Sequence, residues 1–414
     1  MPVSLEVNGR TYHWPSRPTV VICFDGCDPD YIAAAREAGV VPALDRMMGQ
    51  GFAAEALAAM PTFTNPNNVS IVCGAPPSVH GVSGNYYLDR ATGREIMMVD
   101  AAPMRADTIL ARFSQAGGQV IAVTAKDKLR KALARDLAGV AFSAEKAALC
   151  TLAEHGIADV PQLVGRETPD PYSPDLSLFV LDAGIRLIAE RRPDIIYLSL
   201  SDYVQHKHAP GTPEANAFMQ AVDMRLAALL DLGAVVGIVA DHGMTDMATP
   251  EGGANVVYLG DQLDAEFGPG ATRVICPITD PFVRHHGALG GFVRVHLRRN
   301  TIGRDEVLTF LRGLPGIDLA LPREEACARF DLPEDREGDI AVVGRAGVAL
   351  GARAIDHDLS QLAGERLRSH GSLAEQPVPF IVSHRLSEAY VQRAKTAPLR
   401  NIDIFDFVLN GVEG

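Results

Sequence analysis

Basic side chains are in short supply in this sequence of 414 residues. Its 38 lysine and arginine residues stand against 51 aspartate and glutamate residues, which gives a formal net charge of −13. Proteins that bind nucleic acid need clustered cations to displace counterions from phosphates, and the sequence contains no long basic stripe. We therefore expect no nucleic acid as a partner. A small anionic substrate remains compatible with this charge, because the local charge at a site decides its binding.

Long apolar runs are also missing. A transmembrane helix needs roughly 18 or more consecutive apolar residues, and no run in the chain reaches that length. The first ten residues lack the basic and apolar segments of a signal peptide. These absences lead us to expect no membrane partner and a cytoplasmic location.

Cysteine is scarce and scattered. The six cysteines stand at positions 23, 27, 73, 150, 276 and 327. Only Cys23 and Cys27 are closely spaced, and Cys23 lies within an expected buried strand. A zinc site made of cysteines and a disulfide framework are therefore both disfavoured. We expect the cysteines to act as small buried hydrophobic side chains.

The chain does contain a regular alternation of strands and helices between residues 19 and 250. The expected strands are Thr19–Phe24, Gln119–Thr124, Val140–Ser143, Asp194–Leu200 and Ala234–Ala240. The expected helices are Val41–Met48, Asp107–Ala116, Leu176–Arg191 and Glu214–Leu232. A further strand is expected from Pro377 and a closing helix over Asn401–Leu409. This alternation predicts an α/β fold, with a doubly wound, mostly parallel sheet and helices on both faces.

Residues 255–345 have a different pattern. The expected strands here are Thr272–Ile278, Gly291–Leu297, Ile317–Leu321 and Asp339–Val343, and the expected helices are Arg304–Leu314 and Arg323–Phe330. This order predicts a compact α+β cap inserted into a core formed by residues 1–254 and 346–414. Because the insert follows soon after Asp241 and His242, we expect the cap to pack over an edge of the sheet.

Three of the expected core strands end in side chains that can bind a metal. Asp25 follows the first strand, Asp202 and His206 follow the fourth, and Asp241 and His242 follow the fifth. Open parallel sheets bind ligands at the carboxyl ends of their strands, so we expect these side chains to meet. A carboxylate and an imidazole four residues apart can share one face of a helical turn, although such pairs also occur on solvated helices.

A third imidazole, His370, lies just before the last expected strand. These carboxylates and imidazoles suit zinc and outnumber the ligands of one tetrahedral ion, which indicates two metals. Two-metal sites clamp the attacking and leaving oxygens in phosphoryl transfer. The segment 60–68 offers Thr62 and Thr64 as hydroxyl nucleophiles at the start of a helix, with Asn65 as its expected N-cap. Similar residues also cap helices that have no catalytic role.

Three further segments carry groups that could face a substrate. Asn85 lies in a glycine-rich loop that also carries aromatic rings. Lys126 and Lys128 follow a strand end and so bring cations to the same sheet edge, or form a solvated start of a helix. Arg284 and His285 lie in a cationic turn of the cap, which either closes over an anion or faces water.

The segments FDG, PTFTNPNN, GNYY, TAKDKL, SDYVQHKHAPG, ADHGM and SHG, in this order, resemble the alkaline phosphatase superfamily and, within it, the phosphonoacetate hydrolases. The resemblance covers the whole chain. ADHG is shared with nucleotide pyrophosphatases and phosphodiesterases, whereas PTFTNPNN together with TAKDKL is narrower. The resemblance implies hydrolysis of the carbon–phosphorus bond of phosphonoacetate, with two Zn²⁺ ions per subunit.

The resemblance also implies a role for each candidate residue. The ligands of one zinc ion would be Asp202, His206 and His370. The ligands of the other would be Asp25, Asp241, His242 and the hydroxyl of Thr64. The nucleophile, which would form a phosphothreonine intermediate, would be Thr64. Asn85 would donate a hydrogen bond to a phosphoryl oxygen. The substrate carboxylate would be bound by Lys126 and Lys128, with Arg284 and His285 from the cap.

Two other functions stay open. One is a phosphodiesterase or nucleotide pyrophosphatase with the same metals, which needs room for a base and aromatic stacking, whereas the paired lysines favour a small phosphonate. The other is an inactive module that senses a phosphonate, against which the complete ligand set argues. The sequence does not fix the oligomeric state, and a homodimer is one option.

Overall fold

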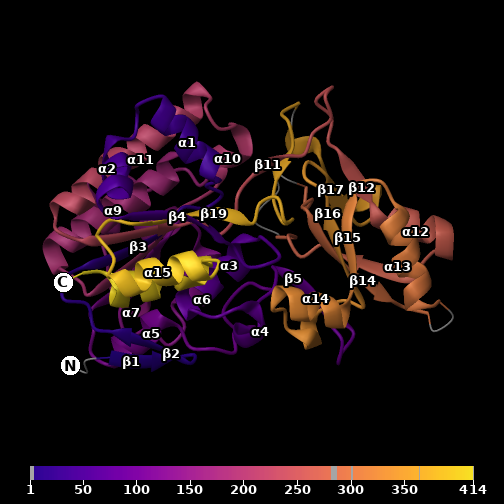
Figure 1. The fold of residues 1–414 in the computed structure, drawn as a ribbon, viewed down its shortest axis with the longest axis horizontal. Helices are drawn as coiled ribbons and strands as arrows, with labels where there is room; N and C mark the ends of the chain where they lie inside the picture. The colour runs from indigo at the N-terminus through magenta and orange to yellow at the C-terminus, as the bar shows by residue number, and fades with distance from the viewer. Residues whose placement is uncertain (1–3, 281–286, 300–301, 363, 414) are drawn as a thin grey trace.

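The computed structural model describes residues 4–280, 287–299, 302–362 and 364–413. Figure 1 shows a larger α/β core, to which both ends of the chain belong, beside a smaller α+β cap drawn mainly in orange. Within the described ranges, no helix is long and apolar enough to cross a membrane. All six cysteines are buried and free, as expected.

The core is built on a seven-stranded sheet. In sheet order its strands are β4 (Phe52–Leu57), β19 (Pro377–Val382), β10 (Val235–Val239), β3 (Thr19–Cys23), β9 (Ile195–Ser199), β7 (Val120–Thr124) and β8 (Val140–Ser143). The strands from β10 to β8 are parallel, and β19 runs antiparallel to both of its neighbours. The parallel strands are buried along their whole length, because helices cover both faces.

Helices lie on both sides of this sheet, which confirms the doubly wound arrangement (Figure 1). On one side are α1 (Pro29–Glu37), α2 (Pro42–Gln50), α9 (Asp175–Arg191) and α11 (Pro213–Asp231). On the other side are α3 (Thr64–Cys73), α5 (Ile109–Gln115), α6 (Asp127–Leu133) and α16 (Ile404–Asp406). Further elements of the core are α4 (Pro77–His80), α7 (Leu152–His155), α8 (Val160–Val164), α10 (Tyr203–Lys207), α15 (Glu388–Thr396) and the hairpin β1 (Ser4–Val7) to β2 (Arg10–His13).

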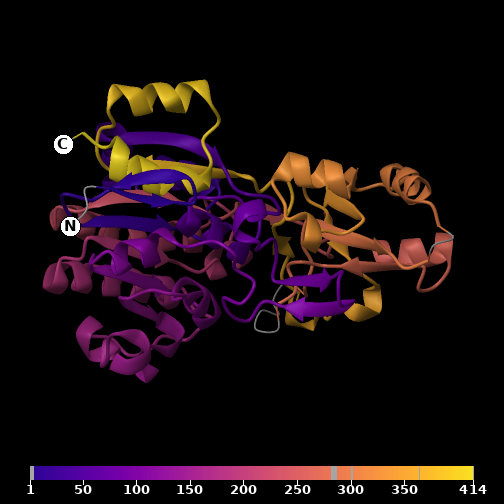
Figure 2. The ribbon, with the colours of Figure 1, turned by 90° about the horizontal axis from the view of Figure 1, so that it is seen from below.

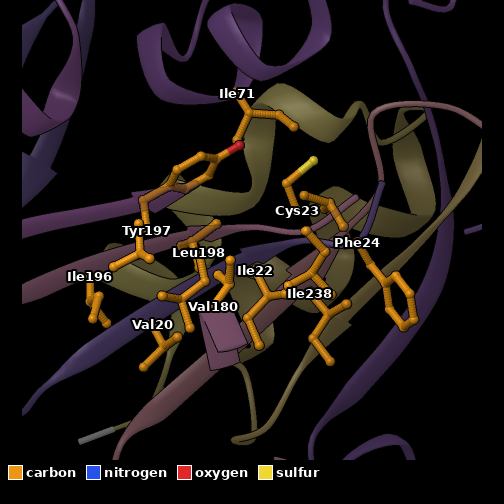
Figure 3. Packing of buried hydrophobic residues seen from close by; sticks show 14 of the residues in the cluster. Val20, Ile22, Cys23, Phe24, Ile71, Val180, Ile196, Tyr197, Leu198 and Ile238 are labelled. Carbon is orange, nitrogen blue, oxygen red and sulfur yellow. The ribbon is translucent and has the colours of Figure 1, made fainter. Parts of the chain in front are cut away.

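Alternate residues of the central strands face opposite helical layers. Tyr197 of β9 reaches toward α3, the helix that carries Ile71 (Figure 3). The next residue, Leu198, packs on the other side against Gly184 of α9, where an added Cβ would lie 2.7 Å from the leucine side chain. Because successive side chains of a strand point to opposite faces of the sheet, the hydroxyl of Tyr197 is directed to α3, the helix that begins at Thr64.

The cap contains a four-stranded antiparallel sheet and its own hydrophobic cluster. In sheet order the strands are β13 (Thr272–Ile275), β14 (Phe292–Leu297), β16 (Ile340–Gly344) and β15 (Ile317–Pro322). The helices are α12 (Leu259–Phe267), α13 (Arg304–Gly313) and α14 (Arg323–Phe330). The cluster extends from Leu259 to Ala352 and includes Met60 and Phe63 of the core. The boundaries at residues 255 and 345 stay a prediction.

Two pairs of strands connect the cap to the rest of the chain. Near the two ends of the expected insert, β12 (Val256–Tyr258) pairs in parallel with β17 (Ala349–Gly351). A hairpin of β5 (Tyr86–Asp89) and β6 (Arg94–Met97) leaves the core and lies against the cap (Figure 2). An ion pair of 2.6 Å between Arg273 Nε of β13 and Glu95 Oε1 of β6 fixes this contact.

The differences from the expectations include an edge strand and the end of the chain. The edge strand β4 was not expected, because its sequence FAAEAL has neither a long apolar run nor a clear alternation. The expected closing helix is divided into a 3-10 turn over Asn401–Asp403, the short α16 and a π turn over Phe407–Gly411.

Candidate metal centre and nucleophile

The three strands that end in aspartates are neighbours in the sheet, in the order β10, β3, β9. Asp241, Asp25 and Asp202 therefore meet at one edge, as the strand ends predicted. Gly26 allows this approach. It has φ of 68°, its N–H donates to Asp241 Oδ1 at 3.2 Å, and an added Cβ would lie 3.0 Å from Asp202 Cβ.

His370 reaches the same edge from the opposite direction. Because β19 is antiparallel, the segment that precedes it lies where the parallel strands end. The short strand β18 (Arg368–Ser369) pairs with β11 (Thr245–Asp246), which follows His242 by a few residues. As a result the rings of His242 and His370 stack, with their centroids 3.5 Å apart and their planes at 7°.

The three imidazoles share one hydrogen-bonding pattern. Each Nδ1 lies against a backbone carbonyl: His206 against that of Arg368 at 2.7 Å, His242 against Gly243 at 2.8 Å, and His370 against Thr62 at 2.7 Å. A carbonyl only accepts hydrogen bonds, so each Nδ1 carries a proton, and in the neutral form of each ring the lone pair is on Nε2. This is the arrangement that orients histidine as a metal ligand.

The Nε2 atoms lie beside the carboxylates. His206 Nε2 is 2.8 Å from Asp202 Oδ2, and His242 Nε2 is 3.3 Å from Asp25 Oδ1. Ligand atoms within 4.8 Å of one another form two groups. They are Asp202, His206 and His370, and Asp25, Asp202 and His242. The two groups share Asp202, and their nitrogen and oxygen donors are of the kind that could hold a metal ion.

The electrostatics of this cluster favour added positive charge. Burial, followed by the charges of Asp202 and Asp241, raises the pKa of Asp25 well above its usual range. Burial lowers the pKa of His370 well below its usual range, and His242 and His206 lower it further. In addition, Asp25 Oδ1 is buried and accepts no hydrogen bond from the described residues. Buried carboxylates of this kind need a counter-charge, which a divalent cation would supply.

Asp241 differs from the other carboxylates, because backbone and amide groups already surround it. Its oxygens accept hydrogen bonds from the N–H of Gly26, the N–H of His242 at 3.1 Å and Asn68 Nδ2 at 3.2 Å. It belongs to neither group of ligand atoms within 4.8 Å, although its Oδ2 lies 3.8 Å from His242 Nε2. Its role as a ligand stays a prediction.

The candidate nucleophile stands at the first position of α3. The expectation that Asn65 caps this helix is wrong. Phe63, in an extended conformation with φ of −120° and ψ of 152°, takes the N-cap position, and the side chain of Asn65 donates to Asn85 Oδ1 instead. Thr64 is partly exposed, while the nine residues after it are buried. Its Oγ1 is 3.2 Å from His242 Nε2, whereas the buried hydroxyl of Thr62 donates to the carbonyl of Ser372 at 3.0 Å.

Asn68 holds the start of α3 against the sheet. Its Nδ2 donates to the carbonyl of Thr64 at 3.0 Å and to Asp241 Oδ2, and its Oδ1 accepts hydrogen bonds from Tyr197 at 2.7 Å and Ser199 at 2.9 Å. Sequence reasoning missed this residue. The available signal was an asparagine at the start of the apolar stretch of a buried helix.

The cap and its neighbouring loop hold Asn85. The backbone N–H of Asn85 donates to the carbonyl of Pro277 at 2.8 Å, and its Nδ2 donates to that of Ile278 at 3.3 Å. Two residues earlier in the same loop, the carbonyl and hydroxyl of Ser83 accept hydrogen bonds from Arg294 Nη2 at 2.9 and 3.0 Å. Arg294 is fully buried and pairs with Glu337 at 2.8 Å. Sequence reasoning assigned no role to this pair.

The two candidate lysines have different surroundings. Lys126 is partly exposed, donates to the carbonyl of Pro171 at 2.9 Å and lies over the ring of Tyr172. Its charge opposes the rise in the pKa of Asp25. Lys128 is nearly buried and pairs with Asp280 of the cap.

The expectations for Arg284 and His285 fall outside the described residues, so both roles stay predictions.

The doubly wound sheet, with the cluster at its edge, is a fold of the phosphodiesterase and phosphatase type. Residues 19–372 match the model of the type I phosphodiesterase/nucleotide pyrophosphatase family. The chain belongs to this family, which matches the expected alkaline phosphatase superfamily.

Two crystal structures of phosphonoacetate hydrolase from Sinorhizobium meliloti are similar to the whole chain. The complex with phosphonoformate has 47% identity and a TM-score of 0.93, and covers 99% of both chains. The complex with phosphonoacetate has 46% identity and a TM-score of 0.92 over the same share. Murine ectonucleotide pyrophosphatase/phosphodiesterase 5, at 18% identity and a TM-score of 0.63 over 94% of this chain and 93% of that one, shares the fold.

Proposed function

We propose that the protein hydrolyses the carbon–phosphorus bond of phosphonoacetate to acetate and phosphate. The proposal rests on one observation. The Thr64 hydroxyl lies at a cluster of carboxylates and imidazoles, in a chain 47% identical over 99% of its length to a phosphonoacetate hydrolase. The substrate of that relative is thereby carried over to this chain.

We further propose two zinc ions in the cluster. The residues for one ion are Asp202, His206 and His370, and those for the other are Asp25, Asp241, His242 and Thr64. The shared position of Asp202 between the two groups supports adjacent ions. When bound, such ions would neutralise phosphonate oxygens and lower the pKa of the attacking hydroxyl.

Thr64 acts as the nucleophile in this proposal. Its hydroxyl gives up a proton to the surrounding water, and its oxygen attacks phosphorus as the carbon–phosphorus bond breaks, which forms a phosphothreonine. The electron pair of the broken bond stays on the carbon as the enolate of acetate, which then takes up a proton. Water hydrolyses the phosphothreonine, so that phosphate leaves and the hydroxyl returns. Thr64 is suited to this step because the positive end of α3 faces the incoming anion.

The lysines act on the other end of the substrate. Negative charge moves toward the acetate carboxylate as the bond breaks, so cations there act mainly in the transition state. Lys126 and Lys128 follow β7, which ends at the same sheet edge beside β9, and this supports the assignment. Asn85 would bind a phosphoryl oxygen. Arg284 and His285 complete the proposed carboxylate site.

Release of phosphate from phosphonoacetate tests the function directly. The zinc-loaded protein is expected to release phosphate from phosphonoacetate and to leave bis-p-nitrophenyl phosphate almost unchanged. The family match makes a phosphodiesterase the second candidate. Equal or faster turnover of the diester would favour it and reject phosphonoacetate as the main substrate. Binding of phosphonates without turnover of either compound would point to a sensing module.

A further inference from the structure

A short segment of the cap, residues 276–280, contacts two of the proposed substrate-binding groups. It leaves the end of β13 and passes over the core. The carbonyls of Pro277 and Ile278 accept hydrogen bonds from the backbone and side chain of Asn85. Two residues further, Asp280 Oδ2 lies 2.5 Å from Lys128 Nζ. One stretch of backbone therefore holds the group for the phosphoryl end and a group for the carboxylate end.

The ion pair between Lys128 and Asp280 is shielded from water. The side chains are 10% and 8% exposed, and the two residues belong to different bodies of the molecule. Burial lowers the pKa of Lys128, and Asp280 opposes this change by favouring the charged ammonium. A lysine side chain is a flexible stem with a point charge, so its position depends on the partner that holds it.

Lys126 lacks such a link in the described part of the chain. Its side chain is 34% exposed, and its contacts are the carbonyl of Pro171, the ring of Tyr172 and Glu145, 4.0 Å away, all within the core. Of the two proposed lysines, Lys128 is thus the one whose position is set from the cap. The distance between its ammonium and Asn85 depends on a few residues of backbone.

We propose that Asp280 is a positioning residue that holds the Lys128 ammonium at a fixed distance from Asn85 and thereby selects phosphonates that carry a carboxylate. The inference rests on the proposed function, because it needs Lys128 and Asn85 to bind the two ends of one substrate. Asp280 acts through Lys128. It repels the substrate carboxylate itself, so its contribution is to the place and charge of the ammonium.

Binding of two ligands to Asp280→Asn tests this role without turnover. Calorimetry on the zinc-loaded protein would compare phosphonoformate, which carries a carboxylate, with methylphosphonate, which lacks one. We expect the variant to bind phosphonoformate about tenfold more weakly or worse, since one partner of a shielded charge pair is lost. Methylphosphonate binding is expected to change less than about twofold. Equal weakening of both ligands would show a general structural role and overturn the proposal, as would no weakening of either.

Two further variants separate positioning from folding. Asp280→Glu keeps the charge and is expected to recover part of the affinity for phosphonoformate. In a Lys128→Met background, Asp280→Asn is expected to have no further effect on phosphonoformate, because its effect passes through the absent ammonium. Full additivity of the two changes would contradict this path.

The matched control is Glu324→Gln, which removes an exposed ion pair of 3.0 Å with Arg304 on the cap. It should leave both affinities unchanged. Phosphate release by the unaltered protein tests the proposed function separately. A protein that shows the ligand selectivity but no hydrolysis would refute the function and keep the role of Asp280. A protein that binds no phosphonoformate would refute the positioning role.

Discussion

Replacement of Asn68 by alanine should destabilise the protein far more than the loss of one side chain suggests. The amide makes four hydrogen bonds, a partly buried one to Thr64 and three buried ones to Asp241, Tyr197 and Ser199. Its removal leaves two hydroxyl groups and one carboxylate oxygen in a site closed to water. Each buried polar group without a partner costs about 1–3 kcal/mol. We therefore expect Asn68→Ala to lower the free energy of unfolding by about 3–5 kcal/mol, a large part of the usual total of about 5–15 kcal/mol.

A second change checks the cause of this loss. Tyr197→Phe in the Asn68→Ala background removes a hydroxyl that has lost its partner, so it should cost about 1 kcal/mol less than Tyr197→Phe does alone. Urea denaturation of the four proteins, with zinc removed by a chelator, gives this coupling. Asn216→Ala, at a partly exposed helix position, is the control and should stay within about 0.5 kcal/mol of the unaltered protein. A loss below about 1 kcal/mol for Asn68→Ala, or strict additivity of the pair, would refute the reasoning.

Three other predictions concern the hydroxyls beside the site and a buried histidine. Thr64→Ala should abolish phosphate release while zinc content, measured by atomic absorption, stays nearly unchanged; retained activity would remove Thr64 from the mechanism. Thr62→Val should keep the activity and lower stability by about 1 kcal/mol, because the Thr62 hydroxyl bonds only the Ser372 carbonyl among the described groups. Burial lowers the pKa of His80 from 6.5 to about 3, so the unfolded state binds a proton that the folded state does not between those pH values. As the pH decreases through this range, this group should therefore lower the free energy of unfolding by about 1.4 kcal/mol per pH unit. In His80→Gln, the urea midpoint should decrease less steeply between pH 6 and pH 4. An unchanged slope would contradict a neutral His80.

The place of the site could be predicted from the sequence, because the features that fix it are local. An apolar run followed at once by Asp25, or by Asp241 and His242, carries both the strand and the group that the strand delivers. Because parallel strands present their carboxyl ends at one edge of a sheet, these groups were expected at the same edge. The order β10, β3, β9, which makes the three strands neighbours, was not predicted. The sharing of Asp202 between two groups of ligand atoms was not predicted, since it depends on how closely the strand ends approach at Gly26.

The supports of the site could not be predicted, because they join residues far apart in the chain. The hydrogen bond between Tyr197 and Asn68 spans 129 residues, and that between Arg294 and Ser83 spans 211. No local pattern marks either pair. Arginine side chains are mostly exposed in proteins, so residue type alone predicts an exposed Arg294. Arg294 is nevertheless fully buried, because Glu337 pairs with its charge and Ser83 accepts its hydrogen bonds.

These contacts indicate that the core and the cap position different groups of the site. The core positions the carboxylates, the imidazoles and Thr64 through strand ends and one helix start. The cap positions Asn85 through Pro277 and Ile278, and it holds Lys128 through Asp280. The matched family is named for phosphodiesterases and nucleotide pyrophosphatases, and one fold can carry sites for different substrates. In the proposed mechanism, the groups that attack phosphorus can therefore stay constant while the groups that recognise the rest of the substrate change. On this argument, the substitutions that alter the choice of substrate should concentrate in the cap segment 276–280 and in the residues it contacts, whereas those at the sheet edge should lower activity on every substrate alike.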